Sequence, residues 1–105
     1  MNAIPKPILS DKSVTVQHRE GTAPTVDNDP IYLRSDLGDQ MNWACDHPGK
    51  TFRITFLNDR SPFARTTFDN QHPDSGPIQP GATGEYKYSV EIDGHINDPK
   101  IIIQP

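Results

Sequence analysis

One cysteine and four histidines are the side chains best suited to metal binding or nucleophilic chemistry in this 105-residue sequence. Cys45 and His47 are separated by a single residue. A thiolate and an imidazole this close could bind copper or zinc, with His95, His72 and His18 as further ligands. The spacing matches no common zinc pattern, and free cysteine is among the most buried residue types. A copper or zinc site using Cys45, His47 and His95 is therefore kept as the alternative hypothesis.

The same pair could form an activated nucleophile if Cys45 met a histidine and a third, orienting group. The sequence has no glycine-rich phosphate loop, nucleophile elbow or paired-carboxylate motif. Asp59, Asp93 and Asp98 lie in predicted turns, where aspartate usually supports the local backbone. We therefore expect no enzymatic activity, no catalytic residues and no cofactor.

Short alternating segments must position these side chains. Residues 51–58 and 85–92 alternate apolar and polar side chains, which is the period of a half-buried strand. Further strands are predicted at residues 13–19, 31–35, 40–45, 64–68 and 100–104. The segments between them are rich in turn residues, and residues 69–84 are predicted to form a long polar loop.

Composition supports the same architecture. Eleven prolines and seven glycines suit short strands joined by turns, and no stretch repeats apolar residues at helical spacing over ten residues. The length fits one domain, residues 1–105, in which residues 1–12 form an extended lead-in. The predicted fold class is an all-β, antiparallel β-sandwich of about seven strands.

Charge and cysteine usage narrow the partners and the compartment. The net charge is −4 and the basic residues form no cluster, so we expect neither nucleic acid nor an anionic membrane surface as partner. One cysteine allows no internal disulfide. No stretch is apolar enough for a secretory signal or a membrane span. The expected location is cytoplasmic, or periplasmic if a leader has been removed.

The segment YKYSVEIDGHINDP, residues 86–99, resembles the ligand-bearing end of the cupredoxins, the plastocyanin and azurin family of copper β-sandwiches. In that family the penultimate strand reads roughly Tyr-x-Tyr-x-Cys, and a following loop supplies a histidine ligand. Tyr86 and Tyr88 match the two aromatic positions, and Gly94-His95 matches a Gly-His pair. The segment GKTFRITFLNDRSPF, residues 49–63, is similar to the strand and loop that carry the first histidine ligand. The resemblance implies a cupredoxin-like Greek-key sandwich.

The resemblance also implies that three of the four copper-ligand positions have been replaced. Phe63 stands in place of the first histidine, Val90 in place of the cysteine, and Pro99 near the methionine position, so only His95 remains. A type 1 copper site needs two imidazoles and a thiolate, with a weak axial ligand. We therefore expect a copper-free protein, in which Val90 packs into the sandwich core.

The loop end carrying Pro62, Phe63, Gly94 and His95 is the predicted binding face, because loops on a rigid sandwich often carry recognition. Phe63 could anchor an interface there, or it could be buried beneath its own loop. An open sheet edge could also pair with a second copy and give a homodimer. The leading hypothesis is a non-catalytic, copper-free module that binds a protein or small ligand.

Overall fold

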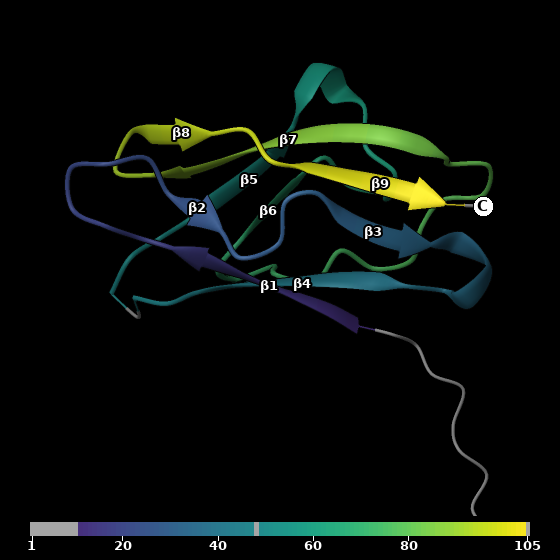
Figure 1. The fold of residues 1–105 in the computed structure, drawn as a ribbon, viewed down its shortest axis with the longest axis horizontal. Helices are drawn as coiled ribbons and strands as arrows, with labels where there is room; N and C mark the ends of the chain where they lie inside the picture. The colour runs from purple at the N-terminus through teal and green to yellow at the C-terminus, as the bar shows by residue number, and fades with distance from the viewer. Residues whose placement is uncertain (1–10, 48, 105) are drawn as a thin grey trace, which may run out of the picture.

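The computed structural model describes residues 11–47 and 49–104, whose regular structure is almost entirely β-strand (Figure 1). In chain order the strands are β1 (Asp11–Gln17), β2 (Thr25–Val26), β3 (Ile31–Arg34), β4 (Gln40–Cys45), β5 (Arg53–Phe56), β6 (Thr67–Asp69), β7 (Gly84–Ile92), β8 (His95–Asn97) and β9 (Lys100–Gln104). The helical elements of the described chain are two 3-10 turns, η1 (Ser35–Leu37) and η2 (Leu57–Asp59). Neither is long or apolar enough to cross a membrane.

The strands form two sheets in a sandwich-like arrangement. One sheet has the order β2-β1-β4, and the other has the order β3-β9-β7-β5-β6, with β8 paired to the end of β7. In Figure 1, β1 and β4 run along the lower side of the view and β7 and β9 along the upper side. This confirms the predicted all-β fold. The sheets are mixed and not wholly antiparallel, because β1 runs parallel to β4 and β3 runs parallel to β9.

An aromatic cluster joins the two sheets. The ring of Trp43, from β4, lies 5.0 Å from that of Phe68 and 5.6 Å from that of Tyr88. Phe56 lies opposite Tyr88 in the register of β5 and β7, with ring centroids 5.3 Å apart. Trp43 and Tyr88 belong to different sheets, so their contact holds the sandwich closed through burial of large apolar surfaces.

Each of the seven predicted strands is present, with ends shifted by up to three residues. β2 and β8 are additional, and both lie in segments that the sequence predicts as turns. Strands of two and three residues are too short to show an alternating pattern. Of the predicted lead-in, residues 1–10 lie outside the described range, and residues 11–12 belong to β1.

The polar loop predicted at residues 69–84 covers the outer edge of β4. The backbone N–H of Trp43 donates a hydrogen bond to the carbonyl of Pro73 at 3.0 Å, and that of Ser75 donates to Met41 at 2.8 Å. The N–H of Met41 donates in turn to the Ser75 hydroxyl oxygen at 2.8 Å. These bonds satisfy backbone groups that an edge strand would otherwise leave open. The loop therefore belongs to the framework of the sandwich.

Candidate functional site

The parallel pairing of β1 with β4 brings two chain segments out of one sheet at the same end. Val16 lies opposite Cys45, the last residue of β4. Just beyond this pair, the backbone N–H of His18 donates a hydrogen bond to Asp46 Oδ1 at 3.0 Å. The turn between β7 and β8 brings Asp93 from the other sheet to the same place. We call the group at this end the polar end cluster: His18, Glu20, Asp46, His47, Lys50 and Asp93.

His18 is the buried member of the cluster. Its side chain is 3% exposed, and its Nε2 lies 3.2 Å from Glu20 Oε1. Its other ring nitrogen, Nδ1, is buried and has no hydrogen-bond partner among the described residues. The ring of His47 packs edge-to-face against it, with centroids 5.1 Å apart. Buried polar atoms are normally paired, so the unpaired nitrogen of His18 needs an explanation.

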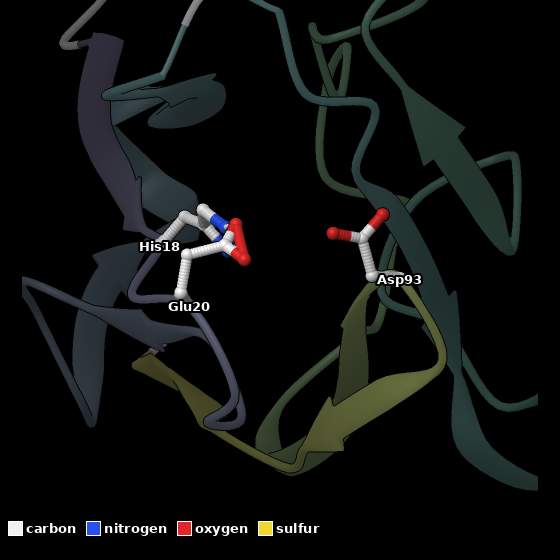
Figure 2. A group of neighbouring side chains, drawn as sticks. All are labelled: His18, Glu20 and Asp93. Carbon is white, nitrogen blue, oxygen red and sulfur yellow. Dashed lines mark hydrogen bonds and ion pairs between the residues drawn. The ribbon is translucent and has the colours of Figure 1, made fainter.

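Two exposed carboxylates share one lysine beside His18. Lys50 Nζ lies 2.6 Å from Asp93 Oδ2 and 3.7 Å from Glu20 Oε1. Figure 2 shows the Asp93 carboxylate facing the His18–Glu20 pair from the opposite side. A hydrogen bond with His18 lowers the pKa of Glu20, and the charge of Lys50 lowers it further. The hydrogen bond between Lys50 and Asp93 lowers the pKa of Asp93 and raises that of Lys50, so all three are ionised at neutral pH.

Backbone contacts fix the point from which the Lys50 side chain extends. The N–H of Lys50 donates to the carbonyl of His47 at 3.0 Å, and Asn70 Nδ2 donates to the carbonyl of Lys50 at 3.1 Å. Asn70 Oδ1 also accepts a hydrogen bond from the N–H of Phe52 at 2.8 Å, which ties this segment to the turn after β6. The side chain itself is 30% exposed and flexible, so it can swing away from the carboxylates while its backbone stays in place.

The metal ligands expected from the sequence do not converge. Cys45, His47 and His95 form no group of three neighbouring ligand atoms among the described residues. The group whose ligand atoms all lie within 4.8 Å of one another consists of His18, Glu20 and Asp93. The alternative ligand set is therefore corrected: only His18, expected as an additional ligand, belongs to the group.

The Cys45 thiol is also not arranged as an activated nucleophile. Its sulfur is half-buried and accepts a hydrogen bond from the backbone N–H of His47 at 3.4 Å. The His47 ring pairs instead with Asp46, with Nδ1 2.9 Å from Oδ1. His72 lies on the surface after β6, where its N–H donates to Asp69 Oδ1 at 2.9 Å. Within the described chain, no hydrogen bond joins the thiol to an imidazole.

The residues of the predicted binding face lie at different points along β7. Phe63 is 3% exposed and its ring packs against that of Phe56, which pairs with Tyr88 in β7. His95 pairs with Ile92, which lies four residues beyond Tyr88 in β7. At the usual rise of a β-strand, Tyr88 and Ile92 are about 13 Å apart. Pro62 is buried with Phe63, whereas Gly94 and His95 are exposed. The four residues therefore do not form one surface, and Phe63 is a core residue and not an exposed anchor.

The three positions expected, from the resemblance to cupredoxins, to replace copper ligands are all buried. Val90 is 0% exposed and pairs with Ile54 of β5, while Phe63 contacts the aromatic cluster. Pro99 is buried where the chain passes from β8 to β9, and its carbonyl accepts a hydrogen bond from the N–H of Tyr88 at 3.0 Å. The first two add apolar side chains to the core, and the third adds a backbone bond to β7.

Three members of the polar end cluster were not predicted from the sequence: Glu20, Lys50 and Asp93. Each lies in a turn segment, where a charged residue is ordinary. The signal that could have found Glu20 is its position two residues after His18 at the end of a strand. Asp93 and Lys50 become neighbours through the antiparallel pairing of β5 with β7, in which Arg53 lies opposite Glu91.

No family model matches the sequence, and no curated protein matches it either.

Proposed function

We propose that this chain is a non-catalytic binding module with a cupredoxin-like scaffold and no type 1 copper site. The burial of Val90 and Phe63 supports the absence of such copper, because an apolar side chain fills each position where the family has a strong ligand. The inward alternation of Tyr86, Tyr88 and Val90 along β7 supports the resemblance in this region. The Cys45 contacts described above support a non-catalytic role.

The observation that carries the binding proposal is the open outer edge of β8. Within the described residues β8 pairs only with β7, whereas the edge of β4 is covered by a loop. The exposed residues here are Gly94, His95 and Ile96, and the Ile96 side chain is 55% exposed. An open strand edge beside an exposed apolar side chain suits the addition of one more strand. The proposed partner is an extended segment of another protein chain.

A pair of matched variants tests this proposal. Ile96→Asp places a charge on the β8 edge, and Tyr32→Asp places one on β3, where Tyr32 is 52% exposed. The tagged full chain and both variants are used to capture proteins from cells that express it naturally. Each candidate is then purified, and its affinity for the three chains is measured by calorimetry.

The expected result is a partner that binds the unmodified chain and Tyr32→Asp but binds Ile96→Asp at least tenfold more weakly. Sedimentation of the same three proteins would identify a second copy as the partner, if a dimer is lost only in Ile96→Asp. Equal binding by all three chains would place the interface elsewhere and refute the proposal that the partner binds at the β8 edge.

A further inference from the structure

We propose that the polar end cluster contains a binding site for one divalent metal ion, with His18 Nε2 and the carboxylates of Glu20 and Asp93 as ligands and Lys50 as a built-in competitor. This proposal goes beyond the binding-module function and does not depend on it. Of its ligands, only His18 was among those expected from the sequence, and none occupies a cupredoxin ligand position.

The three ligand atoms already converge from two sheets. They lie within 4.8 Å of one another, and Figure 2 shows Asp93 directed toward His18 and Glu20. In a tetrahedral zinc site, ligand atoms about 2.0 Å from the metal lie roughly 3.3 Å apart. His18 Nε2 and Glu20 Oε1 are already 3.2 Å apart, so Asp93 is the ligand that must move closer. Its side chain is 52% exposed and free to adjust.

The buried imidazole of His18 supports the site independently of the two carboxylates. The His18 side chain is only 3% exposed. The residue is held at the cluster by the hydrogen bond from its backbone N–H to Asp46. Its Nδ1 has no partner among the described residues. In the neutral ring that donates from Nε2 to Glu20, this orphan Nδ1 carries the lone pair. Moving the proton to Nδ1 frees Nε2 to bind a metal, so the ring can serve as a ligand without first losing a hydrogen bond at Nδ1.

The Lys50 ammonium lies between the two carboxylates, where the metal ion would lie. Its ammonium lies 2.6 Å from Asp93 and 3.7 Å from Glu20, so the carboxylates are already arranged around one positive charge. A divalent ion brings twice that charge. It also accepts the lone pair of the imidazole nitrogen, whereas an ammonium group can only donate a hydrogen bond. The metal must displace Lys50, and the lysine therefore lowers the affinity of the site.

The donor set indicates the class of metal. One imidazole nitrogen with two carboxylate oxygens suits a borderline ion such as Zn²⁺ and suits Ca²⁺ or Mg²⁺ less, because these prefer oxygen ligands alone. Three protein ligands leave a fourth position for water or a ligand atom. The lack of a described acceptor for Nδ1–H lowers the affinity further, since second partners of this kind commonly change it by about 10- to 100-fold. We therefore expect micromolar binding of Zn²⁺.

The test is a calorimetric titration of the full chain with ZnCl₂, supported by the ¹⁵N NMR signals of the histidine rings. Glu20→Gln and Asp93→Asn each remove one ligand and should weaken binding by about tenfold or more. Lys50→Met keeps the apolar stem but removes the competing charge, and should strengthen binding by about tenfold. Matched controls come from the ion pair between Lys100 and Glu85, 3.5 Å apart elsewhere on the surface. Lys100→Met and Glu85→Gln should leave the affinity unchanged.

Three outcomes would overturn parts of the proposal. If neither the unmodified chain nor Lys50→Met binds Zn²⁺ at roughly 100 µM, the site does not exist. If Cys45→Ser or His95→Ala abolishes binding while Glu20→Gln and Asp93→Asn retain it, the ligands are those expected from the sequence. If Lys50→Met and Lys100→Met have equal effects, Lys50 is not a competitor. The expected NMR result is a shift of the His18 ring nitrogens at one equivalent of Zn²⁺.

Discussion

The backbone N–H of His18 donates a hydrogen bond to the Asp46 carboxylate at 3.0 Å, which ties the end of β1 to the end of β4. The same oxygen, Asp46 Oδ1, lies 2.9 Å from His47 Nδ1. The hydrogen bond with the His47 ring, followed by that from the His18 backbone, lowers the pKa of Asp46. One carboxylate thus holds together the two segments that carry the histidines of the polar end cluster.

Replacing this carboxylate should change how stability depends on pH. The pKa of Asp46 is lower in the folded chain than its ordinary value of 3.8, so the ionised group stabilises the fold above about pH 4. This contribution is lost as the pH falls through the lowered pKa. Asp46→Asn should therefore have a lower Tm than the unmodified protein at pH 7, with a gap that narrows toward about pH 2. Thermal unfolding followed by circular dichroism measures the gap, and a gap that is independent of pH would contradict the assignment.

Tyr88 carries a hydroxyl that the core does not satisfy. Its Oη and the Nε1 of Trp43 are both buried and form no hydrogen bond of normal geometry with a described residue, although the nearby indole N–H partly offsets the effect of burial on the pKa of Tyr88. An unpaired buried polar group costs free energy, so Tyr88→Phe should raise the free energy of unfolding by roughly 1 kcal/mol. Urea denaturation at pH 7 measures this change. The control is Tyr32→Phe, whose side chain is exposed and which should alter stability by less than about 0.5 kcal/mol. A destabilised Tyr88→Phe would indicate that the hydroxyl has a partner.

Alkaline pH gives a second, separate prediction for the same residue. Burial raises the pKa of Tyr88 above its ordinary value of 10.0, so the fold favours the protonated phenol. The resulting stability is complete below about pH 10 and is lost as the pH rises toward the folded pKa. The stability advantage of Tyr88→Phe should therefore grow above about pH 10. Urea denaturation at a series of alkaline pH values tests this, and a constant difference would contradict it.

Phe63 should behave as a core residue. It is 3% exposed, and its ring lies 5.9 Å from that of Phe56 and 6.2 Å from that of Phe68. Phe63→Ala should reduce the free energy of unfolding by about 3–5 kcal/mol, through lost burial and a residual cavity. Phe63→Leu should cost less, and it provides a folded variant if the alanine protein does not fold. Denaturation measures both effects. Weakened partner binding by a fully stable Phe63→Leu protein would instead favour the interface role.

Regular alternation is what made the strands predictable. Phe52, Ile54 and Phe56 are each buried at no more than 1% exposure, as are Tyr88 and every second residue that follows it in β7. The parallel pairings could not be predicted, because alternation shows which face of a strand is buried but not which strand lies beside it. β2 and β8 were missed for the different reason that they are too short to show any period.

The candidate site was only partly predictable for the same physical reason. The residues at the end of β4 were recognised because Cys45 and His47 are chemically distinctive within one segment. Lys50 and Asp93 are 43 positions apart, and the ion pair between them depends on which strand pairs with β5, which alternation does not show. The expectation that Phe63 and His95 share one end was wrong in geometry, because the register between β5 and β7 places the chain after Phe56 at the opposite end from the β7–β8 turn.

Ser75 should stabilise the covered edge of β4. Its side chain accepts a hydrogen bond from the N–H of Met41 and donates one to the carbonyl of Gly76, both at 2.8 Å. Ser75→Ala leaves the buried N–H of Met41 without this acceptor, so it should reduce the free energy of unfolding by about 1–3 kcal/mol. Hydrogen exchange should accelerate at the amide of Met41. The matched control is Ser35→Ala, because the exposed Ser35 hydroxyl makes a weaker bond of 3.3 Å to Gln104. Unchanged exchange at Met41 would mean that the loop does not protect this edge.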